Sequence, residues 1–126
     1  MSTEPSALDL ARAAARLALE KKALDVKILT LKDLSSICDY FVIASGEADV
    51  QVKAIGRHIY DELADRGFKP ISREGINDGN WVLLDYIDVV VHVFYEPTRR
   101  FYALEKLWGD APTEEITDEK IMSAKR

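Results

Sequence analysis

Histidine and cysteine, which often perform catalysis or bind metal ions, are few in this chain of 126 residues. It has two histidines, His58 and His92, and one cysteine, Cys38. The histidines fall on separate expected elements, and their spacing is not that of a zinc motif such as HExxH. A single cysteine forms neither an internal disulfide nor a Cys-rich metal site. We interpret His92 and Cys38 as core residues and His58 as a surface residue, and we expect no metal site and no cofactor.

Two carboxylates, Asp85 and Asp88, flank a short expected turn and offer another kind of chemistry. Carboxylates near a turn could bind a divalent cation or divide the roles of acid and base. Their spacing does not give the acid-x-acid pair on one strand face that two-metal phosphoryl transfer favours. Hydrogen bonding within the turn and binding of a basic partner are the two other interpretations. The residues alone leave all three open.

Aromatic side chains gather in the last third of the chain. The expected helix over residues 99–108 carries five large apolar residues around most of its circumference: Phe101, Tyr102, Leu104, Leu107 and Trp108. One short helix cannot bury them all against a single sheet face. Some should therefore either form an exposed patch for a partner or be covered by the C-terminal tail.

Trp81 begins an expected strand, where it is either a core residue or a binding anchor, because tryptophan and tyrosine are enriched in interface hot spots. With Tyr86 and Asp88 it could share one rim of the sheet. That rim would have an aromatic centre and an acidic border, which suits a basic protein surface.

The periodicity of apolar residues predicts the elements that must position these side chains. Helices are expected over residues 6–22, 49–66 and 99–108, and strands over residues 26–31, 40–45, 69–73, 81–84 and 89–94. Ser6 and Asp9 resemble a capping box at the start of the first helix. The run 40–45 is apolar on both faces, as in a central strand. The short link between the last two strands predicts an antiparallel hairpin.

The element order is therefore α-β-β-α-β-β-β-α. It predicts an α/β (α+β) fold with a mixed five-stranded sheet flanked by helices, because a strand, a long helix and a further strand favour a parallel crossover. The length fits a single domain over residues 1–109. Residues 110–126 are polar, and we expect a weakly ordered tail.

Charge and hydropathy exclude some classes of function. The chain has 22 acidic and 17 basic residues, a formal charge of −5. This argues against direct binding of nucleic acid, which needs a positive surface, but not against a basic protein partner. No apolar run approaches the length of a membrane helix, and the N-terminus lacks the pattern of a secretory signal. We expect a cytoplasmic protein without membrane contact.

The same segments resemble the ribosomal silencing factor family, also called Iojap-related proteins. The resemblance covers roughly Ala7 to Ala111 and rests on the order and spacing of several short motifs. They are Ser35-Ser36, Asp39-Tyr40-Phe41-Val42-Ile43-Ala44-Ser45-Gly46, Gln51-Val52, Ala54-Ile55, Glu74-Gly75, Gly79, Trp81-Val82-Leu83-Leu84-Asp85, Asp88-Val89-Val90-Val91-His92-Val93-Phe94, Arg100-Phe101-Tyr102, Leu104-Glu105 and Leu107-Trp108.

The resemblance implies a nucleotidyltransferase-like fold without enzymatic activity. It implies binding to the large ribosomal subunit at its fourteenth L-series protein, on the face that meets the small subunit. The bound factor would then block subunit joining and lower translation when nutrients are short. It also implies a homodimer in the free state.

Carried over position by position, the resemblance implies partner-binding roles for six residues, to which the location of Tyr86 adds a seventh. The six are Trp81, Asp85, Asp88, Tyr102, Glu105 and Trp108. Two alternatives stay open: a small nucleotidyltransferase that uses Asp85 and Asp88 with a divalent metal, and a dimerising adaptor. One position departs from the family pattern, since Ile87 stands where glycine is usual. Glycine suits positive φ in a tight turn, so Ile87 should be strained or sit in another type of turn.

Overall fold

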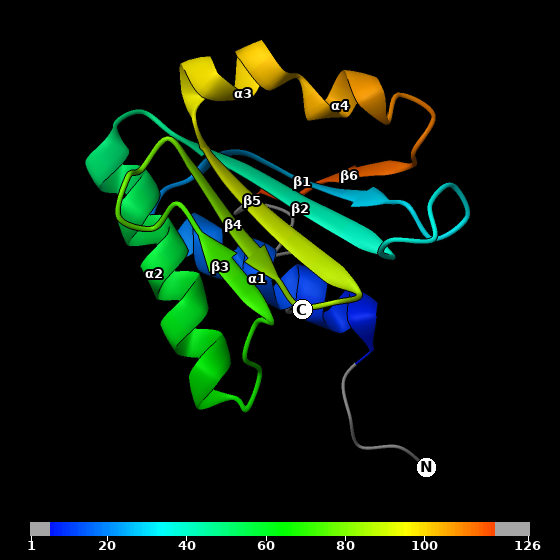
Figure 1. The fold of residues 1–126 in the computed structure, drawn as a ribbon, viewed down its shortest axis with the longest axis horizontal. Coiled ribbons are helices and arrows are strands. Elements are labelled where there is room, and N and C mark those ends of the chain that lie inside the picture. Colours follow the sequence, from blue (N-terminus) through cyan, green and yellow to red (C-terminus); the bar gives the residue numbers. More distant parts are fainter. Residues whose placement is uncertain (1–5, 118–126) are drawn as a thin grey trace.

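The computed structural model describes residues 6–117. A six-stranded sheet forms the centre, with α1 and α2 on one face and α3 and α4 across the other (Figure 1). In chain order the elements are α1 (Ala7–Glu20), β1 (Leu24–Thr30), β2 (Tyr40–Gly46), α2 (Asp49–Asp65), β3 (Ser72–Glu74), β4 (Trp81–Asp85), β5 (Val89–Tyr95), α3 (Glu96–Tyr102), α4 (Leu104–Leu107) and β6 (Thr113–Glu115). The predicted fold class is confirmed.

The sheet has the strand order β3-β4-β5-β2-β1-β6. Strands β2 and β5 are parallel neighbours, and the other pairs are antiparallel, as a mixed sheet requires. The predicted count of five strands was wrong, because Thr113–Glu115 pairs with β1 as a sixth strand. This strand falls within the segment predicted to be a weakly ordered tail, and residues 118–126 of that segment lie outside the described part.

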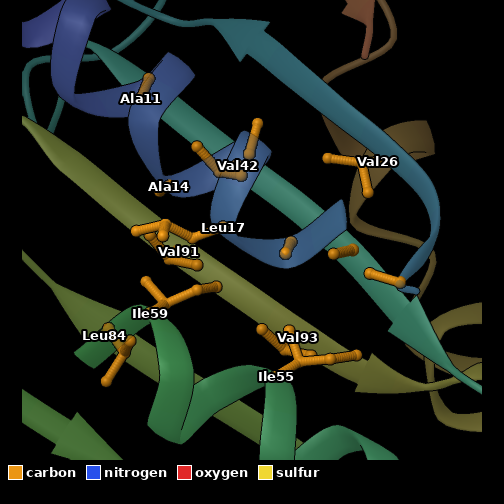
Figure 2. Packing of buried hydrophobic residues seen from close by; sticks show 14 of the residues in the cluster. Ala11, Ala14, Leu17, Val26, Val42, Ile55, Ile59, Leu84, Val91 and Val93 are labelled. Atoms are coloured by element: carbon orange, nitrogen blue, oxygen red, sulfur yellow. The ribbon is translucent and has the colours of Figure 1, made fainter. Parts of the chain in front are cut away.

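The main core lies between the sheet and α1 with α2. Ser6 caps α1 and forms the predicted capping box with Asp9. The predicted apolar stripe of α2 is fully buried and consists of Val52, Ile55, Ile59 and Leu63. Figure 2 shows Ile55 and Ile59 beside the valines of β5. A Cβ on Gly56 would lie 2.8 Å from Val82, so glycine lets α2 approach β4 closely.

The predicted helix over residues 99–108 is two helices rather than one. It starts earlier, with α3 at Glu96, and breaks at Ala103, which adopts a left-handed conformation with φ 48°. The helix is interrupted there, and α4 follows α3 across the same face of the sheet (Figure 1). The break allows side chains from α3 and from the segment after α4 to contact different parts of the same sheet face.

The link between β4 and β5 is a tight hairpin, as predicted. Ile87 has φ 75°, and the backbone N–H of Asp88 donates to the carbonyl of Tyr86 over 3.0 Å. This is a γ-turn with positive φ, a rare and strained geometry. A β-branched residue is an outlier at such a φ, so the predicted strain at Ile87 is present.

Candidate functional site

The sheet face beneath α3 and α4 carries a connected group of rings, here called the aromatic cluster. Its members are Phe41, Trp81, His92, Phe94, Tyr102 and Trp108. The ring of Trp81 lies 4.8 Å from the rings of both Phe94 and Tyr102, measured between centroids. Phe41 lies 4.5 Å from His92 and 6.2 Å, edge-on, from Trp108. Strands and helices far apart in sequence thus form one aromatic surface.

Strand alternation decides which predicted residues join this surface. Along β4, Trp81, Leu83 and Asp85 point to the face of the aromatic cluster, whereas Val82 and Leu84 point to α2. Tyr86 follows this alternation into the main core and is only 8% exposed. The predicted shared rim of Trp81, Tyr86 and Asp88 is therefore corrected: Tyr86 lies on the opposite side of the sheet. Burial raises the pKa of its hydroxyl to about 12.

Tyr102 of the aromatic cluster and its apolar neighbours on α3 and α4 are open to solvent. Phe101, Leu107 and Tyr102 are 81%, 72% and 52% exposed, and Trp108 is half-buried. Residues 110–117 leave these side chains uncovered, because that segment runs beneath them to pair with β1. Within residues 6–117, these apolar side chains therefore form an exposed patch, which was one of the two expectations for this region.

His92 lies buried at the centre of the aromatic cluster and is 4% exposed. Its Nδ1 accepts a hydrogen bond from the indole Nε1 of Trp81 over 3.1 Å. Burial lowers the pKa of His92 to about 4, so the imidazole is neutral near pH 7. The predicted core position is confirmed. His58 instead packs half-buried between helices, with its Nε2 2.8 Å from Glu20 of α1.

Three carboxylates stand around the end of this face where β2 and the β4–β5 hairpin meet, and we call Asp39, Asp85 and Asp88 the acidic edge. One oxygen of Asp85 accepts the backbone N–H of Ile87 over 2.8 Å, the turn hydrogen bond that was one of the three interpretations. Beneath them Cys38 is 5% exposed. Burial first, and then the charges of the acidic edge, raise the pKa of its thiol to about 11, as expected of an unreactive core cysteine.

The acidic edge does not assemble with further ligands. Among residues 6–117, no group of three or more His, Cys, Asp or Glu side chains is arranged to hold a metal ion. In the same range, no helix has the length and apolar character needed to span a membrane.

Glu105 is engaged within the protein. Its carboxylate accepts from Arg99 Nε over 2.7 Å and lies 3.3 Å from Lys27 Nζ. The hydrogen bond from Arg99 is the main reason why the pKa of Glu105 is lowered. Arg99 is one of three buried polar or charged residues in the described structure. Arg99 was expected to open a helix, with no role in a site, whereas it lies in the last turn of α3.

The predicted site residues are thus partly assembled. Trp81, Tyr102 and Trp108 lie in the aromatic cluster, and Asp85 and Asp88 lie at the acidic edge of the same face. Glu105 belongs to α4 and forms an ion pair within the protein, and Tyr86 lies on the other face. The arrangement is an exposed aromatic surface with an acidic border. Such a surface suits protein recognition, because aromatic residues are enriched at the centres of interfaces.

Comparisons with known proteins agree on one family. The family model for "Ribosomal silencing factor during starvation" matches residues 4–126. The ribosomal silencing factor RsfS of Bacillus subtilis (strain 168) is 44% identical over 97 residues, which are 77% of this chain and 82% of that protein. A mouse relative, "Mitochondrial assembly of ribosomal large subunit protein 1", is 30% identical over 92 residues, which are 71% of this chain and 40% of that protein.

A crystal structure of a protein from Chromobacterium violaceum has the same fold. Its TM-score is 0.81 at 31% sequence identity, and the match covers 83% of this chain and 88% of that one. The relatives are named for regulation or assembly of the ribosome. The chain therefore belongs to the ribosomal silencing factor family, which indicates a role in silencing the ribosome during starvation.

Proposed function

We propose that this protein docks on the large ribosomal subunit and prevents the small subunit from joining. The partner is a basic ribosomal protein, the fourteenth of the L series, on the face of the large subunit that meets the small one. The bound domain then blocks joining by its bulk and lowers translation when nutrients are short. The observation that carries this proposal is that exposed aromatic side chains and the acidic edge lie on the same face of the sheet.

The chemistry of this surface matches a basic partner. Tyrosine and tryptophan supply large contact areas at low entropic cost and dominate interface energetics. The ring of Tyr102 packs against Trp81, and the ring of Trp108 packs edge-on against Phe41. These contacts hold both rings in place before any partner binds. The acidic edge and the formal charge of −5 attract a positive surface and speed encounter. An interface of about 1,600 Å² in total would suffice for specific binding.

The name of the mouse relative supports the choice of subunit, since it refers to assembly of the large ribosomal subunit. The family description supplies the condition, which is starvation. The identity of the basic partner comes from the family resemblance.

Sedimentation with separated ribosomal subunits tests the proposal. The protein should travel with the large subunit and not with the small one. Tyr102→Ala should weaken this binding by about tenfold, because the side chain is exposed and its removal costs the fold little. Tyr60→Ala is the matched control, since Tyr60 lies on α2 and contacts Arg73 on the other side of the sheet. Binding to neither subunit, or equal loss in both variants, would contradict docking through the aromatic cluster.

A second copy of the chain is also a candidate occupant of this surface. Phe101 and Leu107 are the most exposed apolar side chains of α3 and α4, and apolar exposure of this kind favours self-association in the free protein. A homodimer formed there would compete with docking on the ribosome. Light scattering over a dilution series would detect it, and Tyr102→Ala should shift the equilibrium toward monomer.

A further inference from the structure

A buried arginine of α3, Arg99, joins this helix to α4, β1 and β2. The Nη1 of Arg99 donates to the hydroxyl of Ser45 over 2.7 Å and to the carbonyl of Asp25 over 2.8 Å. Its Nε donates to Glu105 over 2.7 Å. Arg99 thereby ties α3 to the end of β2, to the start of β1 and to α4. A guanidinium suits this task because its donors point outward in a fixed planar fork.

Two backbone irregularities bring the acceptors to Arg99. The pairing of β1 with β2 shifts register between Leu24 and Lys27, and Asp25 within this bulge has φ 46°. Such bulges redirect a strand locally, and here the carbonyl of Asp25 points to Arg99. The left-handed Ala103 breaks the helix, so that α4 turns and Glu105 meets Arg99.

The apolar packing of α3 and α4 is only partly buried: Leu104 packs on the sheet face, and Tyr102 contacts Trp81. Arg99 is the single buried residue of α3, and α4 has none among its four residues. A cavity of about 540 Å³ opens beside these helices, and its lining includes Lys27, Ser45, Arg99 and Glu105. The hydrogen bonds of Arg99 therefore contribute much of the attachment of α3 and α4 to the sheet. Tyr102, three residues later on α3, and Trp108, just after α4, are carried by the same two helices.

We propose that Arg99 is a positioning residue for partner binding: with Glu105 it holds α3 and α4 in the arrangement that presents Tyr102 and Trp108. Arg99 itself does not touch the partner. Glu105, expected from the family resemblance to contact the partner, acts on it indirectly through Arg99 and Lys27. This inference rests on the proposed function, because it concerns the surface that docks on the ribosome.

The first test compares Arg99→Met with Arg100→Met. Arg100 is the adjacent residue, is exposed, and forms only a peripheral ion pair with Glu96 at 3.6 Å. Arg99→Met should weaken binding to the large subunit at least tenfold, and Arg100→Met should leave it unchanged or slightly stronger. Equal effects of the two variants would overturn the inference.

A second measurement needs no ribosome. Amide hydrogen exchange of the free protein should become at least tenfold faster over residues 96–108 in Arg99→Met. Exchange in α1 and α2 should stay as in the wild type. Unchanged protection of residues 96–108 would show that Arg99 does not hold the helices and would overturn the proposal.

Glu105→Gln distinguishes a role of Glu105 in positioning α4 from direct contact with the partner. It also tests the proposal if Arg99→Met does not fold. The variant leaves the bonds of Arg99 to Ser45 and Asp25 in place and removes the charge that joins α4. A positioning role predicts faster exchange over residues 103–108, weaker binding, and an unchanged dependence of affinity on salt. Weaker binding with a reduced salt dependence and normal exchange would mean that Glu105 touches the partner directly, which contradicts the proposal.

Different results would contradict the proposed function and the positioning role of Arg99. If the wild-type protein binds no large subunits, the proposed function is wrong whatever the exchange data show. If the wild type binds and Arg99→Met binds equally well despite faster exchange over residues 96–108, docking stands and the positioning role is wrong.

Discussion

Trp81 and His92 face the same side of the sheet from neighbouring strands, and the indole Nε1 of Trp81 donates a hydrogen bond to the imidazole Nδ1 over 3.1 Å. This bond fixes the indole of Trp81 beneath Tyr102. It also assigns the tautomer of His92, since an accepting Nδ1 carries no proton and Nε2 must carry it. The centre of the proposed docking surface is therefore a neutral, hydrogen-bonded pair set among other rings.

Trp81→Phe keeps a ring in place but removes the donor. His92 Nδ1 would then be a buried acceptor without a partner, so we expect the free energy of unfolding to fall by about 1–3 kcal/mol. Urea unfolding at pH 7 measures this loss. Trp108→Phe is the matched control, because within residues 6–117 the Trp108 side chain makes a ring contact with Phe41 but no hydrogen bond. Similar losses in both variants would show that packing, not the hydrogen bond, is responsible.

His92 should make stability depend on pH in the mildly acidic range. Burial lowers its pKa from 6.5 to about 4, so the unfolded chain binds a proton more readily than the folded one between these values. Stability is therefore fully present above the unfolded pKa and falls as the pH drops. From pH 7 to pH 5 the loss attributable to His92 is about 2 kcal/mol. His92→Gln should show a correspondingly smaller loss, whereas an equal loss in both proteins would contradict the account.

The acidic edge should contribute to docking through charge. Asp88 is exposed and belongs to the acidic edge, so Asp88→Lys should weaken binding to the large subunit by about five- to tenfold, mostly through slower association. Asp61→Lys makes the same charge change on the exposed side of α2 and should have a much smaller effect. Surface plasmon resonance at two salt concentrations would compare them. A similar decrease in both variants would mean that overall charge, rather than the acidic edge, governs binding.

Ile87→Gly should stabilise the protein. Ile87 has φ 75° and is 58% exposed, so its side chain gains little burial while its backbone is strained. Glycine adopts positive φ freely, and relief of strain should raise the free energy of unfolding by about 1 kcal/mol. Ile87→Ala is the control, because alanine keeps the Cβ and therefore the strain. A gain of the same size in Ile87→Ala would show that the side chain, not φ, is the cause.

Much of the fold follows from local patterns in the sequence. The capping box of Ser6 and Asp9, the apolar stripe of α2 and the short link at Ile87 each depend on neighbouring residues alone, and all three are present in the structure. Strand β6 was missed because Thr113–Glu115 is a polar edge strand without apolar alternation. The break at Ala103 was missed because alanine is the best helix former and gives no signal of a left-handed conformation.

The candidate site was harder to predict, because it depends on which residues share a face. The position of Tyr86 could have been read from the period of two along β4, in which Val82, Leu84 and Tyr86 alternate with Trp81 and Asp85. No local pattern could predict the buried hydrogen bonds of Arg99, because their acceptors on Asp25 and Ser45 lie 74 and 54 residues away along the chain. Of the aromatic cluster, Trp81, Tyr102 and Trp108 were predicted as site residues, whereas the contacts that add Phe41, His92 and Phe94 depend on strand pairing and were not predicted.

A subunit-joining assay shows whether the bound protein keeps the small subunit from the large one. Large subunits are first incubated with the protein at fixed salt, small subunits are added, and the joined fraction is measured by sedimentation. We expect this fraction to fall as the large subunit becomes occupied, and we expect Tyr102→Ala to require about tenfold more protein for the same effect. An unchanged joined fraction on fully occupied large subunits would contradict silencing by steric block.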